Sequence, residues 1–342
     1  MRHRLLAVAV GLAALSAVSS HVGAEFKAPA VTLYIPSGVG GGYDVYGRLA
    51  ARHLGRFLPG NPAIVPKNMP GAGGVVMANY LYNIAPKDGT AIALFQAGSL
   101  FEPLFGNPQT KFEPTKLNWL VSLNRLVDIG IFWHATPIRT VDDFIKDQVV
   151  VGSSGGSNAS TEVFPKLLNN LAGTKFKVIT GYTGVGETML AMERGEVQGI
   201  VGAELSGFRA GRPDWIRDGK ARIVLQIVLT KSPDLQGVAS AIDLVKNEAD
   251  REVFELLLTR VEHGRPFTLP PDTAPDIVVT FQRAFAAMVK DPAFLQDAGN
   301  IRADVSVTTG EDIQALLAKT YASPKPLLER AIAEFKKAGG SY

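Results

Sequence analysis

The chain of 342 residues contains no cysteine and little histidine. Disulfides, thiolate nucleophiles and cysteine-ligated zinc or iron–sulfur sites are therefore excluded. Five histidines are present, and no H-E-x-x-H motif brings two of them together. Two of the five, His3 and His21, fall in a segment that we expect to be removed. The others, His53, His134 and His263, lie far apart in the sequence, so we expect no metal site.

Neither sign of charge dominates the composition. Lys and Arg number 35 and Asp and Glu number 32, and removal of Arg2 and Arg4 with the N-terminal segment leaves 33 basic residues against 32 acidic ones. This near balance gives no reason to expect nucleic acid or an anionic membrane surface as a partner.

Long apolar runs are absent except near the N-terminus. There, two arginines precede an uncharged and mostly apolar stretch over 5–18, and the small residues of Val22-Gly23-Ala24 follow. This pattern is typical of a secretory signal peptide, which we place at residues 1–24 with cleavage before Glu25. The apolar stretch is shorter than the roughly 20 residues that a membrane span needs. We therefore expect the mature chain to be exported.

Strand patterns alternate with helix patterns along most of the chain, which predicts an α/β fold with mainly parallel sheets flanked by helices. The alternation is interrupted by a proline- and glycine-marked stretch over 103–114 and then restarts. We therefore expect two lobes, with crossings near 95–105 and 225–232. Lobe 1 comprises 25–104 and 230–342, and lobe 2 comprises 105–229. Strands are expected at 31–36, 62–65, 90–95, 127–133, 148–151, 176–180, 197–201 and 222–229.

Three glycine-rich loops each follow a predicted strand and precede a predicted helix: 37–44, 152–158 and 181–186. Glycine lets the backbone approach a ligand closely, and the N-terminus of the following helix favours an anion. The loops also carry hydroxyl groups, at Ser37, Ser153, Ser154, Ser157 and Thr183. Together they predict an anion pocket built from neutral groups; the alternative is that each loop is only a tight turn.

Two kinds of enzyme site were compared with these loops. The first loop lacks the dinucleotide-binding fingerprint, because Tyr43 stands where the last glycine or alanine belongs, and no Walker A lysine follows. We therefore expect no nucleotide cofactor, nor any other cofactor. The second loop does fit G-x-S-x-G over 152–156, with Ser154 as the nucleophile and His263 as the only histidine after it. A secreted serine hydrolase is therefore the alternative function.

Several motifs, in this order, resemble those of the Bug-type periplasmic solute receptors, the binding component of tripartite tricarboxylate transporters. A strand ends in a Pro/Gly-rich turn closed by aspartate over 35–44, and Asn68-Met69-Pro70-Gly71-Ala72-Gly73-Gly74 follows. Asp88-Gly89-Thr90 then opens the next strand, and a G-x-S-G-x-G-S-like segment lies at 152–157.

The resemblance implies a two-lobed Venus-flytrap protein of the periplasm, without catalysis, that holds a small carboxylate and presents it to a membrane permease. It also leaves open a sensor that serves a signalling partner. We expect a monomer. The expected ligand-binding residues are Ser37, Gly41, Gly42, Tyr43, Asp44 and Gln96 in lobe 1, and Ser153, Ser154, Ser157, Asn158, Tyr182 and Thr183 in lobe 2.

The chain departs from the family pattern at two informative positions. Tyr43 replaces the usual threonine or serine, and Met69 replaces the usual arginine. Tyr43 either stacks on an aromatic acid or fills space, and the loss of the arginine favours a less anionic ligand. We expect Asp44 to cap a helix that starts near Val45 rather than to face a carboxylate.

Overall fold

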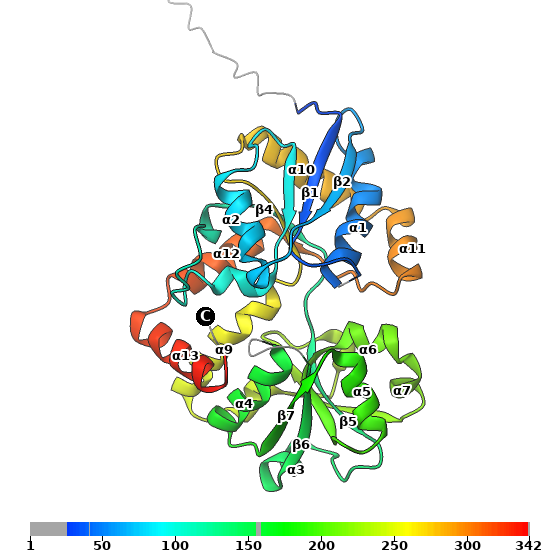
Figure 1. The fold of residues 1–342 in the computed structure, drawn as a ribbon, viewed down its shortest axis with the longest axis vertical. Helices are drawn as coiled ribbons and strands as arrows, with labels where there is room; N and C mark the ends of the chain where they lie inside the picture. The colour runs from blue at the N-terminus through cyan, green and yellow to red at the C-terminus, as the bar shows by residue number, and fades with distance from the viewer. Residues whose placement is uncertain (1–25, 41, 155–158, 341–342) are drawn as a thin grey trace, which may run out of the picture.

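The computed structural model describes residues 26–40, 42–154 and 159–340, apart from the side chains of Ser154 and Ala210. The predicted signal peptide, Gly41, Ser157 and Asn158 therefore lie outside the described residues. Figure 1 shows two α/β halves, one above the other, each built around its own sheet. The predicted two-lobed α/β fold is confirmed.

The sheet of the first half has the strand order β12-β4-β11-β3-β1-β2. β1 runs parallel to both of its neighbours, whereas β11 runs antiparallel to β3 and β4. Its strands are β1 Ala30–Ile35, β2 Ala63–Asn68, β3 Ala91–Leu94, β4 Asn118–Ser122, β11 Pro266–Leu269 and β12 Thr308–Thr309. The helices of this half are α1 Gly42–Leu54, α2 Val75–Asn83, α10 Pro275–Met288, α11 Pro292–Asn300 and α12 Gly310–Tyr321.

The sheet of the second half has the strand order β10-β9-β5-β8-β6-β7. β6 runs parallel to β7 and β8, and β5 runs antiparallel to β8 and β9. Both sheets are therefore mixed rather than mainly parallel as predicted, because strands such as β4, β5 and β11 pair antiparallel with their neighbours. Its strands are β5 Asp128–Trp133, β6 Val149–Ser154, β7 Phe176–Tyr182, β8 Gly199–Glu204, β9 Ala221–Ile227 and β10 Ala239–Ser240. Its helices are α3 Val141–Lys146, α4 Ser160–Ala172, α5 Val185–Glu193, α6 Leu205–Gly211 and α7 Pro213–Arg217.

Two long helices join the halves. After the short α8 (Ala241–Leu244), α9 (Glu248–Glu262) returns the chain from the second half to the first, and the C-terminal α13 (Lys325–Lys337) packs against α9 and α4. In Figure 1 both helices lie beside the junction of the two halves. One continuous apolar core runs from Phe95 and Phe101 through Phe254 and Phe335 to Phe164 of α4, so the halves share buried surface along this side.

The strand assignments place both crossings later than the sequence predicts. β4 belongs to the first sheet, so the chain crosses at 123–127 rather than near 95–105. β10 belongs to the second sheet, so the return follows Ser240 rather than 225–232. The physical reason is that β4 is short and pairs only with β11 and β12, which come much later in the chain.

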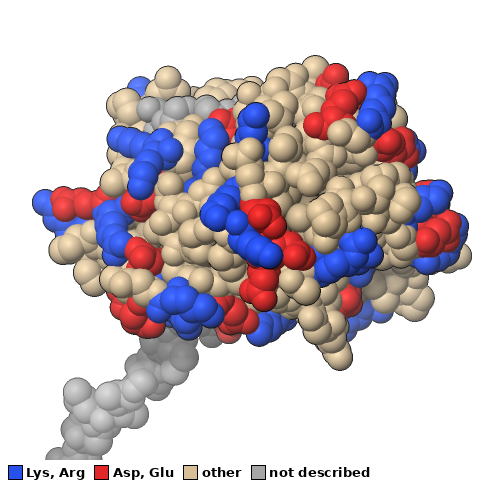
Figure 2. All heavy atoms as spheres, turned by 90° about the horizontal axis from the view of Figure 1, so that it is seen from below, with Lys and Arg blue, Asp and Glu red and all other residues tan. Residues whose placement is uncertain are grey.

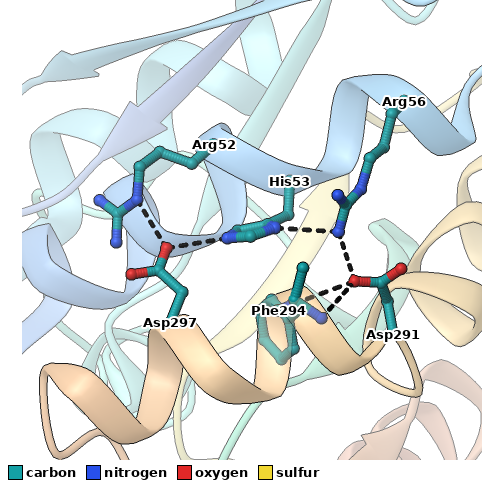
Figure 3. A network of polar contacts seen from close by, with 7 residues as sticks. Arg52, His53, Arg56, Asp291, Phe294 and Asp297 are labelled. Carbon is teal, nitrogen blue, oxygen red and sulfur yellow. Dashed lines mark hydrogen bonds and ion pairs between the residues drawn. The ribbon is translucent and has the colours of Figure 1, made fainter.

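The histidine of the first helix has a packing role, as its position on the apolar side of α1 predicts. His53 Nε2 lies 2.8 Å from an Asp297 carboxylate oxygen on α11, and its ring meets the Phe294 ring edge-on at 5.6 Å (Figure 3). Arg56 contacts His53 Nδ1 at 3.1 Å and Asp291 at 2.5 Å, and Asp291 caps α11. These contacts fix α11 to α1.

On the outer surface of the second half, basic and acidic side chains are mixed, as the near-equal numbers of the two in the sequence lead one to expect. Figure 2 shows Lys and Arg interspersed with Asp and Glu on the face that points away from the first half, without a large patch of one sign. Among the residues that the structure describes, no helix is long and apolar enough to cross a membrane.

Candidate functional site

The two sheets turn corresponding edges toward each other. The carboxyl ends of β1 and β3 and the start of β11 lie at one edge of the first sheet, since β11 is antiparallel to β3. The carboxyl ends of β6 and β8 and the start of β5 lie at one edge of the second sheet. Ligands of open α/β sheets bind outside the carboxyl ends of the strands, so this junction is the candidate site.

An ion pair links the halves at this junction. Arg265, directly before β11, is only 4% exposed. Its partner is Glu204, the last residue of β8. Arg265 Nη1 donates to Glu204 Oε1 at 3.1 Å, and Arg265 Nη2 donates to Glu204 Oε2 at 2.9 Å. Ser206, in the first turn of α6, donates its hydroxyl to Glu204 Oε1 at 2.5 Å. Bidentate geometry of this kind fixes direction as well as distance.

The Arg265 guanidinium is also enclosed by α1. It lies 4.5 Å from the ring centre of Tyr46 and 5.3 Å from that of Tyr43, which are cation–π distances. A Cβ on Gly42 would stand 2.7 Å from Arg265 Nη2, so any larger residue there would force the guanidinium to shift. Arg265 Nε is buried and has no hydrogen-bond partner within the part of the chain that the structure describes.

Tyr43 is held by contacts within the protein. Its hydroxyl accepts the Ala97 N–H at 3.0 Å, and its ring lies under Arg265. Burial raises the pKa of Tyr43, against the opposing effect of Arg265. The ring therefore forms part of the wall of the site and is not a free stacking surface.

Asp44 organises the first glycine-rich loop. Its buried carboxylate accepts from the Gly40 N–H, Arg48 Nε and Asn68 Nδ2, each at 2.9 Å. Asn68 Nδ2 also donates to the Ser37 carbonyl at 2.8 Å. Burial opposes ionisation of Asp44, but the hydrogen bonds from Arg48, Gly40 and Asn68 outweigh it and hold its pKa below the ordinary value.

The expected role of Asp44 needs one correction. α1 begins at Gly42, not near Val45, so Asp44 lies in the first turn and is not the N-cap. It does accept a backbone N–H, as expected, but from the preceding loop rather than from the helix. The loop needs this anchor because Gly40 has a φ of 85° and no strand or helix holds it.

A cavity of about 540 Å³ opens beside the ion pair. α1 and the first loop, the end of β8 with α6, Arg265, and the segment after α11 line it. The first N–H groups of a helix have no acceptor within that helix, and Gly42, Tyr43 and Val45 at the start of α1 line this cavity. Of the predicted ligand-binding residues it contains Gly42 and Tyr43. Its lining residues are Gly40, Gly42, Tyr43, Val45, Tyr46, Glu204, Ser206, Gly207, Arg265, Ile301, Arg302 and Ala303.

The other described residues that were predicted in the first half, Ser37, Asp44 and Gln96, are not among the lining residues of this cavity. The Ser37 hydroxyl is half-buried and donates to the neighbouring Gly38 carbonyl at 3.2 Å. Gln96 is half-buried beside Gly74, at the end of β3.

The predicted residues of the second half are mostly engaged in local contacts. Ser153 is fully buried, with its hydroxyl 3.2 Å from that of Thr161. Thr183 donates its N–H and its hydroxyl to Glu187, at 2.7 and 2.9 Å. Tyr182 is half-buried over Gly152. The hydroxyls of Ser153 and Thr183 are therefore not free donors of an anion pocket.

A second buried acid lies next to Glu204. Asp128 is the cross-strand neighbour of Glu204 in the β5–β8 pair and is 5% exposed. Burial, reinforced by the Glu204 charge, raises the pKa of Asp128 from 3.8 to about 8, although a hydrogen bond from Ser160 opposes the shift. In the described ranges of the chain, Asp128 Oδ2 finds no hydrogen-bond partner. At neutral pH this carboxyl therefore keeps its proton.

Sequence reasoning missed Asp128, Glu204 and Arg265. They come from three separate segments, and only the fold brings them together. The sequence held one signal, since each of the three is a charged residue at or directly beside the end of a strand that is mostly buried. Charged residues at such positions are usually taken for solvated turn residues, so the signal was overlooked.

The geometry does not support the serine-hydrolase alternative. His263 is 1% exposed, and neither of its ring nitrogens has a hydrogen-bond partner among the described residues. Burial lowers its pKa to about 4. The side chain of Ser154 lies outside the described residues, and no described serine bonds to His263 as the hydrolase hypothesis requires.

Comparison with known proteins points to one family. A family model described as the tripartite tricarboxylate transporter family receptor matches residues 48–332. Over 339 residues the chain is 25% identical to the "UPF0065 protein in gbd 5′region" of Cupriavidus necator, which covers 94% of this chain and 93% of the relative.

Solved structures share the fold. A TctC solute-binding protein from Polaromonas matches with a TM-score of 0.67 and 20% identity, over 88% of this chain and 98% of that one. MatC from Rhodopseudomonas palustris, with bound malate, matches with a TM-score of 0.59 and 17% identity, over 90% and 98%. The family resemblance inferred from the motifs is confirmed.

Proposed function

This chain belongs to the receptor family of tripartite tricarboxylate transporters, and we propose that it captures a small organic carboxylate between its two halves and delivers it to the membrane subunits of such a transporter. The family consists of periplasmic solute-binding receptors, and the proposed location of this chain is the periplasm, after loss of residues 1–24. A structural relative holds malate, which supports a carboxylate as the ligand.

One observation carries the proposal. The N-terminus of α1 and the buried Arg265 line the same cavity between the halves. A carboxylate there would accept from N–H groups at the positive end of the helix dipole and would lie beside the positive charge of the guanidinium.

The two crossing segments supply the hinge of the proposed closure. Leu126 donates its N–H to the Val261 carbonyl at 3.2 Å, so the crossings run side by side. Gly264 has a φ of 58°, and a Cβ there would stand 1.8 Å from the Asn124 carbonyl oxygen. Hinges of this kind are a few residues at the ends of elements that absorb changes in φ and ψ.

Ligand-induced stabilisation of the mature chain tests the proposal. Thermal unfolding and calorimetry against mono-, di- and aromatic carboxylates should identify at least one acid that stabilises the protein by about 2.7 kcal/mol at a hundredfold excess over Kd. Arg265→Lys should weaken that binding, because lysine cannot replace the guanidinium fork. The matched exposed variant Arg217→Lys should not change it. A flat response across the panel would exclude a carboxylate receptor.

Two further measurements separate the alternatives. A fluorophosphonate probe should leave Ser154 unlabelled, because the structure offers it no paired histidine. Affinity capture from the native membrane should recover transporter subunits, whereas recovery of a signalling protein would favour the sensor function.

A further inference from the structure

We infer that the ligand carries a hydrogen-bond donor, a hydroxyl or an ammonium group, within one or two carbons of its carboxylate, and that Glu204 accepts from this donor. The inference rests on the proposed function and specifies which carboxylates the cavity selects. It follows from the unused acceptor capacity of Glu204 and from the distance between Glu204 and α1.

Glu204 retains acceptor capacity at the cavity. A carboxylate offers about four lone-pair positions. Oε1 accepts from Arg265 Nη1 and from the Ser206 hydroxyl, whereas Oε2 accepts from Arg265 Nη2 alone among the described residues. The side chain of Glu204 is 27% exposed, in contrast to 5% for Arg265, and Glu204 lines the cavity. Oε2 can therefore receive one more donor, which must come from water or from a ligand.

The anion-binding end and the acceptor end are close together. Arg265 Nη2 lies 2.9 Å from Glu204 Oε2 and 2.7 Å from the point where a Cβ would stand on Gly42, in the first turn of α1. A ligand whose carboxylate rests on the N-terminus of α1 beside Arg265 thus brings its adjacent carbons to Glu204. A substituent farther along a chain would pass beyond this acceptor.

The charge of Glu204 decides what the adjacent carbons can carry. A second carboxylate at this point would face an anion across a partly desolvated gap, where like charges repel strongly. An apolar carbon would leave Oε2 to water or without a partner, and hydrogen bonds to charged acceptors are the stronger kind. A hydroxyl or ammonium group avoids both problems, because it is not an anion and it donates a hydrogen bond to Oε2.

Matched acids that differ only in the donor test the inference in the wild-type protein. Calorimetry should be run with propionate, lactate and alanine, and with succinate, malate and aspartate. We expect the donor-bearing member of at least one series to bind tenfold or more tightly than its parent acid. The hydroxy and amino acids of each series show which of the two donors Glu204 prefers.

The variant Glu204→Gln then assigns the effect to this residue, with the exposed Glu196→Gln as the matched control. The tenfold advantage should fall below threefold in Glu204→Gln and persist in Glu196→Gln. If parent acids bind wild type as tightly as donor-bearing acids, the inference is wrong while the proposed function stands. Preference retained in a folded Glu204→Gln protein also overturns it. If no acid of any kind binds, the proposed function itself fails.

Discussion

Asp128 provides a sharp test of the electrostatics at the junction, through the substitution Asp128→Asn. The asparagine side chain has the size of a protonated aspartic acid and can keep the contact with Ser160. Because burial and the neighbouring Glu204 raise the pKa of Asp128 to about 8, the folded protein holds a proton that the unfolded chain releases near pH 3.8. Folding then binds a proton at every pH between these two values.

The sign of the pH dependence follows from this linkage. The folded state binds more protons than the unfolded state, so the contribution of Asp128 to the free energy of unfolding falls as pH rises from about 4 to about 8. Each pH unit in that window costs up to about 1.4 kcal/mol, so the loss between pH 5 and pH 8 is about 4 kcal/mol. Asparagine does not titrate, so Asp128→Asn removes this loss. Above pH 8 both proteins should change in parallel.

Urea unfolding of the mature chain at pH 5, 6, 7, 8 and 9 measures the effect. The stability of Asp128→Asn relative to wild type should rise by about 4 kcal/mol between pH 5 and pH 8. The exposed Asp147→Asn should follow wild type throughout. Parallel curves for wild type and Asp128→Asn between pH 5 and pH 8 would show that Asp128 is ionised in the folded protein and refute the reasoning.

Three further substitutions have expected outcomes that urea unfolding can check. His53→Ala should cost about 1–3 kcal/mol, because it removes the 2.8 Å contact with Asp297 and a buried ring; no change would mean that α11 does not depend on it. Gly264→Ala should cost more than about 3 kcal/mol, because its Cβ would overlap the Asn124 carbonyl; a mild effect would show that the crossings can separate freely. Asp44→Ala should lower the free energy of unfolding by about 2–4 kcal/mol near pH 7. The loss should be much smaller below the lowered pKa of Asp44, because the carboxylate is then protonated and its stabilising contacts are gone in wild type as well. An equal loss above and below that pKa would contradict this reasoning.

Local patterns in the sequence predicted much of the fold. The start of α3 carries a capping box formed by Thr140 and Asp143, and α10 has Pro275 in its first turn, both of which are helix-start signals that can be seen in the sequence. β4 and α9 were missed for physical reasons. β4 has partners that come much later in the chain. α9 buries Leu256, Leu257 and Leu258 in succession, so no single apolar stripe marks it as a helix.

The site was predicted in part, because one component is a loop of consecutive residues and the other is a contact between residues far apart in the sequence. The glycine-rich loop over 37–44 is a local feature, and Gly42 and Tyr43 do line the cavity. The pairing of Glu204 with Arg265 joins residues 61 positions apart on different sheets, and no local pattern indicates it. Where buried charges meet depends on sheet order, which the sequence reasoning did not resolve at β11.

The structure changes which residue is expected to discriminate among acids. Tyr43 was a candidate for stacking on an aromatic ligand, yet its hydroxyl is bonded to the Ala97 N–H and its ring is covered by Arg265. Met69, in place of the family's arginine, packs against the apolar core and brings no charge to the cavity. The charged residues that line the cavity are Arg265, its partner Glu204, and Arg302. Because Glu204 is the one with an exposed, under-used acceptor, the chemistry beside the ligand's carboxylate depends on Glu204 more than on Tyr43.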